Sequence, residues 1–141
     1  MKTKTKSQSK KPVPNKELIK KWVARLRNPN MRQTKLQMKD KRGKGYCCLG
    51  HACIVTGLGK FSDRDTFNGE PCYGKMPVSI ADMFGIPSNP VLSIPNHLIK
   101  KYSLGGINHS RTASILNDAH EFTLKDIADC IEFTYLKKCV K

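Results

Sequence analysis

The residues that could do chemistry are concentrated in one short stretch, which contains Cys47, Cys48, His51 and Cys53. Thiolates and imidazoles are ligands that zinc prefers, and His51 follows Cys47 by four residues, so both could face one side of a helix. Cys72 could supply a further ligand. A structural zinc site is usually built from separated pairs of ligands, and this sequence has no second pair. The pattern therefore favours buried thiols over a metal site, and we predict no cofactor.

A cysteine nucleophile is the second chemistry that the sequence allows. It requires a thiolate beside a base and a group that orients the base. Six cysteines and four histidines make chance pairs easy to find, and no pattern places such a pair in a cleft. Asp118 could act as an acid–base carboxylate, but an aspartate in an Asn-Asp turn more often accepts hydrogen bonds from local amides. Residues 42–45 lack the spacing of a phosphate-binding P-loop. We therefore predict that the protein is not an enzyme.

The net charge lies almost entirely in the first third of the chain. The 141 residues carry a net charge of +15, and residues 1–45 hold sixteen of the 26 basic residues but only two of the 11 acidic ones. The remainder is nearly neutral. This distribution indicates a basic segment attached to a neutral body, and such segments bind polyanions.

The sequence predicts non-specific nucleic-acid binding through phosphate contacts. The predicted residues come from an N-terminal arm, a first helix and a loop: Lys2, Lys4, Lys6, Lys10, Lys11, Lys16, Lys20, Lys21, Arg25, Arg27, Lys41, Arg42 and Lys44. The alternative is a protein-interaction module whose basic residues meet an acidic partner. A basic helix face that is merely solvated is also common.

The chain shows no signal for export or membrane insertion. Its N-terminal residues include no apolar stretch like that of a secretory signal, and no run approaches the roughly 18 apolar residues of a membrane span. The cysteines are then expected to be free thiols in a reducing compartment. We predict a cytoplasmic protein that makes no membrane contact.

The elements that must position these residues are predicted to form one small α+β domain over residues 15–141, after a disordered basic arm over residues 1–14. Short helices are expected to pack on a small antiparallel sheet or hairpin. The clearest element is an amphipathic helix that begins after Asn15 and ends before Pro29. Its apolar residues recur at helical spacing: Leu18, Ile19, Trp22, Val23 and Leu26.

The middle of the chain predicts a strand and a buried helix. Residues 33–39 alternate like a half-buried strand, with one face formed by Thr34, Leu36 and Met38. Tyr46 and Cys47 are expected to pair with this strand. A short amphipathic helix should follow, with Gly57 in the left-handed position past its end and Leu58 folded back onto Cys53.

Turn and cap signals divide the rest of the chain. They predict an Asn68-Gly69 turn between strands around 66–67 and 72–73. A helix should open at Pro77, close at Gly85 and bury Met76, Ile80, Met83 and Phe84. Further along, we expect a helix capped by Asn96, a turn capped by Ser110 that runs to Leu116, and a turn at Asn117-Asp118.

The last predicted helix has a complete start signal. Thr123 is its cap, Asp126 is its third helical residue, and Phe122 can pack on Ile127. Similar sequences open helix-turn-helix DNA-binding units, but a recognition helix should then follow at once. Here the apolar pattern runs on through Tyr135, which favours a core helix.

Several of these pieces occur together in one order: Trp22-Val23-x-x-Leu26-Arg27, Gln33-x-Lys35-x-x-Met38, Tyr46-Cys47-Cys48-Leu49-Gly50, Leu116-Asn117-Asp118, then Phe122, Ile127-Ala128-Asp129 and Ile131. The set resembles a group of small uncharacterised proteins encoded by tailed bacteriophages and some bacterial genomes, over about residues 18–135. The resemblance implies a phage-type accessory protein in the host cytoplasm or the virion, and it implies no activity. An acidic partner would then be a host factor or a virion protein.

Overall fold

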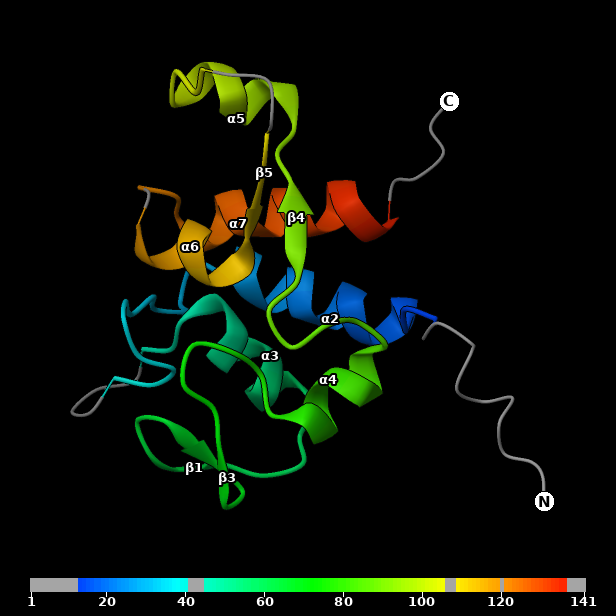
Figure 1. The fold of residues 1–141 in the computed structure, drawn as a ribbon, viewed down its shortest axis with the longest axis vertical. Helices are drawn as coiled ribbons and strands as arrows, with labels where there is room; N and C mark the ends of the chain where they lie inside the picture. Colours follow the sequence, from blue (N-terminus) through cyan, green and yellow to red (C-terminus); the bar gives the residue numbers. More distant parts are fainter. Residues whose placement is uncertain (1–12, 41–44, 106–108, 120, 137–141) are drawn as a thin grey trace.

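The computed structural model describes residues 13–40, 45–105, 109–119 and 121–136. Their fold is α+β, as predicted, with short helices and two small antiparallel sheets (Figure 1). In chain order the elements are α2 (Lys16–Arg27), α3 (Cys48–Val55), β1 (Phe61–Asp63), β2 (Thr66–Phe67), β3 (Glu70–Pro71), α4 (Val78–Phe84), β4 (Val91–Ser93), α5 (Asn96–Lys101), β5 (Ser110–Thr112), α6 (Ala113–Asp118), α7 (Leu124–Ile131) and the π-helix η1 (Glu132–Leu136).

α2 is the central helix and packs against α7, α3, η1 and α4 (Figure 1). The Asn15 side chain caps it by accepting a hydrogen bond from the Leu18 N–H at 3.1 Å. All five of its predicted apolar residues are buried, and Asn28 ends it before Pro29. The predicted bounds and the predicted buried face of this helix are confirmed.

α7 begins with the predicted capping box. Thr123 Oγ1 accepts a hydrogen bond from the Asp126 N–H at 3.1 Å, and Asp126 Oδ2 accepts one from the Thr123 N–H at 3.1 Å. Phe122 and Ile127, the expected hydrophobic pair, are both buried. Among the described residues η1 follows α7 directly, with no turn leading to a further helix. The prediction of a core helix is confirmed.

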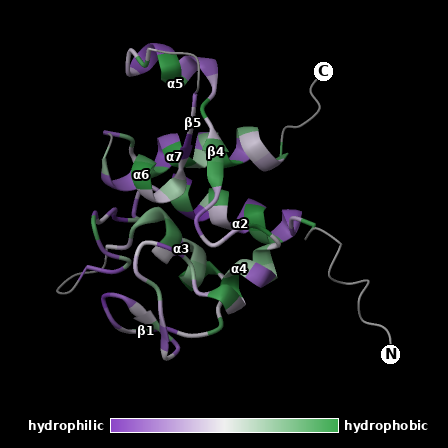
Figure 2. Ribbon diagram, in the orientation of Figure 1, coloured by the Kyte–Doolittle hydropathy of each residue, from purple (hydrophilic) through white to green (hydrophobic). Residues whose placement is uncertain are grey.

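The predicted short buried helix is confirmed as α3, but its predicted amphipathic character is wrong, because the first six of its residues are buried all round. Residues 48–53 are all buried, and Figure 2 shows hydrophobic colour along α3 and hydrophilic colour around β1. Glycine is required at Gly50, because an added Cβ would lie 2.1 Å from the Met38 carbonyl oxygen. Gly57 has the expected left-handed φ of 73°. Leu58 is exposed and does not fold back onto Cys53, because its N–H turns towards Thr56 Oγ1.

Residues 33–39 form an irregular loop, so the predicted strand is wrong. Only two isolated bridges are present there, and both join the loop to Tyr46. Leu36, expected on the buried face, is 82% exposed and has a φ of 65°. The reason is long-range hydrogen bonding, since Asp118 accepts from the Leu36 N–H at 2.9 Å and Asp65 accepts from the Met38 N–H at 3.3 Å.

The first sheet has the order β1-β2-β3, and the predicted Asn68-Gly69 turn connects β2 to β3. Both turn residues have positive φ, 51° and 82°, as a tight hairpin requires. The third strand is Glu70–Pro71, not the predicted 72–73. α4 starts after Pro77 and ends at Gly85 with φ 70°, as expected, although Met83 is partly exposed.

The second sheet pairs β4 with β5, and it corrects several predicted caps. Ser110 lies in β5 and caps no helix, while Thr112 precedes α6. Asn96 is the first residue of α5, so the cap position belongs to Pro95. Asn117 and Asp118 form the last turn of α6 and do not form a separate turn. These caps could not be placed from sequence because short polar runs fit adjacent registers equally well.

Candidate functional site

The predicted cations of α2 fall into two groups. Lys16, Lys20 and Lys21 are exposed, and Lys20 lies 3.7 Å from Glu17 in an ion pair whose two side chains are mostly solvated. Such a pair contributes little to stability, so Lys20 can exchange Glu17 for a phosphate at small cost. Arg25 and Arg27 are half-buried in internal contacts instead.

Arg25 joins α2 to α3. Its Nε donates a hydrogen bond to His51 Nδ1 at 2.9 Å, and its guanidinium lies 5.9 Å from the centre of the Tyr46 ring. Burial lowers the pKa of Arg25 from its ordinary value. The side chain therefore tethers the two helices and is only partly available to a ligand.

His51 has both ring nitrogens engaged. Because Arg25 donates to Nδ1, the proton lies on Nε2, which donates to the Arg32 carbonyl oxygen at 2.8 Å. Burial, assisted by the Arg25 charge, lowers the pKa of His51 to about 4. His51 is thus a neutral structural residue with no nitrogen left for a metal.

Arg27 joins α2 to the C-terminal helices. Its Nη2 contacts Asp129 Oδ1 at 2.7 Å and Glu132 Oε1 at 3.0 Å, and the hydrogen bond to Glu132 raises the pKa of Arg27. Burial raises the pKa of Asp129, but hydrogen bonds from Arg27 and His97 outweigh it and leave that pKa lowered. Two carboxylates therefore balance the Arg27 charge within the protein.

The other predicted nucleic-acid contacts, which are Lys2, Lys4, Lys6, Lys10, Lys11, Lys41, Arg42 and Lys44, lie outside the described residues, as do residues 1–12 of the predicted disordered arm. Val13 and Pro14 are described, and Pro14 lies against Gly85 at the end of α4. Sequence reasoning left out Arg32, which is exposed in the loop after α2. The sequence signal that could have identified Arg32 is its position in the strongly basic first third of the chain.

The buried cysteines are poor nucleophiles. Burial raises the pKa of the Cys47 and Cys130 thiols to about 12 and that of Cys72 to about 11, and it also raises the pKa values of Cys48 and Cys53. Cys47 Sγ instead caps α3 by accepting a hydrogen bond from the Gly50 N–H. Over the described ranges, no group of three or more His, Cys, Asp or Glu side chains is arranged to hold a metal ion.

The motif residues that are far apart in sequence meet in one buried network around Asn117. Its Oδ1 accepts hydrogen bonds from the Cys48 N–H and from Gln33 Nε2, each at 3.0 Å. Its Nδ2 donates to the Thr34 carbonyl at 2.8 Å and to Asp118 Oδ1 at 2.8 Å. The network fixes the loop after α2 against α3 and α6.

Asp118 is part of this network, which corrects its predicted role as a turn residue bonded to local amides. Its Oδ1 accepts from the Leu36 N–H, which is 82 positions away. A cavity of about 130 Å³ adjoins the network, with room for a few ligand atoms. Its lining comprises Leu36, Gln37, Met38, Cys47, Leu49, Gly74, Ser114, Asn117 and Asp118. The arrangement is better suited to holding the loop and the two helices together than to carrying out a reaction.

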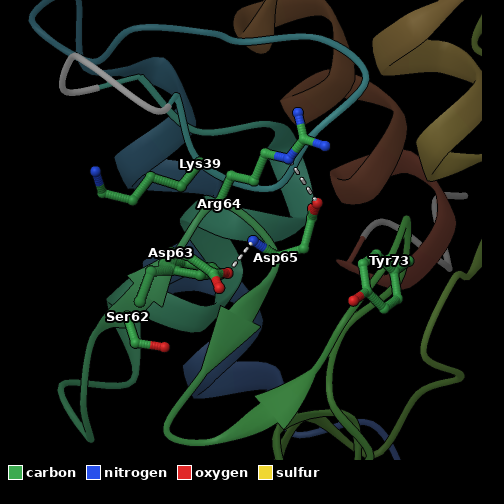
Figure 3. A pocket seen from close by; sticks show the side chains of 7 residues that line it. Lys39, Ser62, Asp63, Arg64, Asp65 and Tyr73 are labelled. Atoms are coloured by element: carbon green, nitrogen blue, oxygen red, sulfur yellow. Dashed lines mark hydrogen bonds and ion pairs between the residues drawn. The ribbon is translucent and has the colours of Figure 1, made fainter.

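A larger hollow of about 590 Å³ opens beside the β1–β2 hairpin and is lined by Lys39, Phe61, Ser62, Asp63, Arg64, Asp65 and Tyr73 (Figure 3). Asp65 is buried at its floor, where it accepts a hydrogen bond from the Met38 N–H and pairs with Arg64 Nε at 3.3 Å. Tyr73 is 71% exposed. Sequence reasoning missed this site because only the fold brings Lys39 and Tyr73 beside residues 61–65, the end of β1 and the turn after it.

Comparisons with known proteins give one informative match. None of the described helices is long and apolar enough to cross a membrane. Neither a curated protein nor a solved structure matches the chain. A family model described as "Domain of unknown function (DUF8296)" matches residues 14–135, from just before the cap of α2 to Tyr135 in η1. The match covers most of the chain, including the Asn117 network and the hairpin hollow, and the chain therefore belongs to the DUF8296 family.

Proposed function

We propose that this protein is a non-enzymatic accessory protein of bacteriophage type that binds nucleic acid non-specifically through its basic first third. The supporting observation is the charge distribution, with sixteen of 26 basic residues before position 46. Within the described part of this segment, Lys16, Lys20 and Lys21 are exposed on α2, and Arg32 is exposed in the loop after it. The protein would act in the host cytoplasm or in the virion.

The physical basis is release of counterions from phosphates. For duplex DNA, log K falls by about 0.9 per unit of log salt for each phosphate that a protein neutralises. If the basic segment engages about five phosphates, the slope is roughly −4.5, and a change from about 50 to about 200 mM salt weakens binding roughly 500-fold. Flexible lysines reach phosphates without reading base edges, so random and defined sequences should bind alike.

The test is a salt series by fluorescence anisotropy on the full chain and two charge variants. The first variant replaces Lys2, Lys4, Lys6, Lys10 and Lys11 with Ser, and the second is Lys20→Ser with Lys21→Ser. A matched control, Lys100→Ser with Lys125→Ser, removes two exposed lysines from the neutral body. The first two variants should bind more weakly and show a shallower slope, by about 0.9 for each phosphate that is no longer neutralised, and the control should not. Absence of binding at low salt, or equal weakening in the control, would rule out the proposal.

A protein-interaction module that meets an acidic host or virion protein is the second candidate. The observation that favours it is Leu36, which is 82% exposed beside the exposed Lys35. A tagged pull-down from infected cells, with absorbance measured for co-purifying nucleic acid, distinguishes the two. A stoichiometric protein partner without nucleic acid, whose binding is abolished by Leu36→Ser, would favour the second candidate.

A further inference from the structure

The hollow beside the hairpin combines an exposed aromatic ring with two cations. Lys39 belongs to the basic first third proposed above to bind nucleic acid, whereas Arg64 and Tyr73 lie outside it. We infer that the hollow is a stacking subsite for a base of single-stranded nucleic acid, with Tyr73 as the platform and Lys39 and Arg64 contacting the neighbouring phosphates. This inference rests on the proposed nucleic-acid binding and specifies the form of nucleic acid that the protein prefers.

Tyr73 is the first observation. Its ring is 71% exposed, and it makes no hydrogen bond or ring contact with any described residue. Its backbone is nevertheless well anchored, because Cys72 is fully buried and donates its N–H to the Asp65 carbonyl oxygen at 2.9 Å. A large ring held at the surface on an anchored turn loses little conformational entropy when a flat ligand stacks on it.

The two cations are the second observation. The Lys39 N–H donates to the Arg64 carbonyl oxygen at 3.0 Å, and this bond joins the irregular loop at residues 33–39 to the hairpin. The Arg64 side chain is 59% exposed and pairs with Asp65 Oδ2 through Nε at 3.3 Å, and no contact with a described residue other than Asp65 is made by its guanidinium. Lys39 and Arg64 come from separate segments that line the hollow (Figure 3) and could contact successive phosphates.

Asp63 determines which part of the nucleic acid enters the subsite. One of its oxygens accepts a hydrogen bond from the Asp65 N–H at 2.9 Å, and the other has no partner in the described part of the chain. A carboxylate repels phosphates but accepts hydrogen bonds from the exocyclic amines of adenine, cytosine and guanine. The base, not the backbone, should therefore enter the hollow, with bases that carry an amine preferred over thymine or uracil.

The size and position of the hollow fit this assignment. At about 590 Å³ it lies within the range of roughly 300–1,000 Å³ typical of small-ligand sites. Ring contacts link it to α2, because Phe61 of its lining lies 5.7 Å from Tyr46, whose ring contacts Arg25. A duplex keeps its bases stacked inside and cannot use such a platform, so only single strands should gain from it.

The experiment compares Tyr73→Ala with its matched control Tyr73→Phe in the full chain. Three probes are used: a fluorescein-labelled single-stranded oligoadenylate, the same oligomer with abasic sites, and a duplex of equal length. Tyr73→Ala should weaken binding of the intact single strand by about 5- to 150-fold, the range expected when one base can no longer stack. It should leave the salt slope and the duplex affinity unchanged, and Tyr73→Phe should bind like the natural protein. Asp63→Asn should reduce the preference for oligoadenylate over oligothymidylate.

The outcomes separate this inference from the proposed function. If the natural protein binds the duplex but Tyr73→Ala keeps its full single-strand affinity, or weakens equally on the abasic oligomer, the stacking subsite is refuted and the phosphate interface stands. If the natural protein binds none of the probes at low salt, both fail. Equal melting temperatures for the two Tyr73 variants, expected for an exposed side chain, would exclude unfolding as the cause.

Discussion

α2 packs against two regions that are held to it in different ways. On the α7 side, apolar stripes at helical spacing meet, and the capping box fixes where α7 begins. On the α3 side, polar bonds add to the apolar packing: Trp22 Nε1 donates to the Cys48 carbonyl at 2.9 Å in a buried bond, and Arg25 donates to His51 in a half-buried one. Apolar surface is buried in both regions, but their polar groups differ. Arg27 and Asp129 pair in a half-exposed position on the α7 side, whereas Trp22 and His51 make their bonds with little access to water on the α3 side.

The two regions should therefore fail in different ways. Apolar burial is non-directional, so removing a methyl group costs free energy in proportion to the space left. A buried hydrogen-bond network is directional, so removing one partner leaves others unsatisfied, and protonating one acceptor can break it. Substitutions of buried apolar residues in α7 should lower stability at every pH, whereas the bonds of His51 in the α3 region should be lost in acid.

The largest effect is expected in the apolar region. Ile127 is fully buried in α7, and Ile127→Ala should lower the free energy of unfolding by about 2–5 kcal/mol, as large-to-small core substitutions do. Urea unfolding at neutral pH measures this, with the exposed Lys125→Ala on the same helix as a control that changes little. A decrease below about 0.5 kcal/mol, the usual range for surface sites, would mean that α7 is not docked as described.

The second effect is a pH dependence in the polar region. The pKa of His51 is about 4 in the folded protein and 6.5 in its ordinary state, so the unfolded chain binds a proton more readily than the folded one. Its contribution is complete above pH 6.5 and is lost as the pH falls towards 4, by roughly 3 kcal/mol. Unfolding curves between those pH values should show the decrease. His51→Gln should show less of it, because the titrating imidazole is gone and only the carboxylates that both proteins share still respond to acid. Identical pH profiles would contradict the neutral, buried state of His51.

The third effect concerns the Asn117 network. Asn117→Ala removes the acceptor of the Cys48 N–H and the donor to the Thr34 carbonyl. A buried group left unsatisfied costs about 1–3 kcal/mol, so the free energy of unfolding should fall by at least that amount. Asn89→Ala is the matched control, because among the described residues the Asn89 side chain bonds only Ser114, and it is less buried. Equal decreases in the two variants would show that the network adds nothing beyond an ordinary surface hydrogen bond.

The same contrast explains how much of the fold can be predicted from the sequence. The α2 and α7 helices are predictable with their caps and buried faces because periodicity and capping are local signals. The Asn68-Gly69 turn and Gly85 are predictable because positive φ demands particular residues. The strand prediction for residues 33–39 fails because Asp118 and Asp65, distant in sequence, hold their N–H groups. Alternation in the sequence cannot reveal such partners.

The candidate site follows the same rule. The exposed lysines of α2 can be predicted from helical periodicity, because the apolar stripe defines the opposite face. The internal roles of Arg25 and Arg27 cannot, since their partners His51 and Asp129 lie on other helices. Tyr73 escapes sequence reasoning because a single tyrosine in a loop carries no pattern, and only the fold places it beside Lys39 and Arg64.

The smallest expected effect has the opposite sign and tests how strongly the network constrains the loop. Leu36 has a φ of 65°, a conformation that costs a residue with a Cβ about 1–2 kcal/mol, and its side chain is mostly exposed. Leu36→Gly removes this strain and keeps the N–H that Asp118 accepts. Glycine gains entropy in the unfolded chain, worth about 0.5–1 kcal/mol, so the net stabilisation should be about 0.5–1 kcal/mol. Urea unfolding at neutral pH measures the change.

Gly57→Ala is the control for this prediction, because it introduces the backbone strain that Leu36→Gly removes. Because φ there is 73° and a Cβ would meet no neighbour, backbone strain alone should destabilise the variant by about 1 kcal/mol. If Leu36→Gly destabilises the protein while Gly57→Ala behaves as expected, the Leu36 side chain contributes packing at the 130 Å³ cavity that outweighs its backbone strain. The loop would then be held by apolar contact as well as by Asp118, and the contrast with the α7 region would be weaker than the hydrogen bonds suggest.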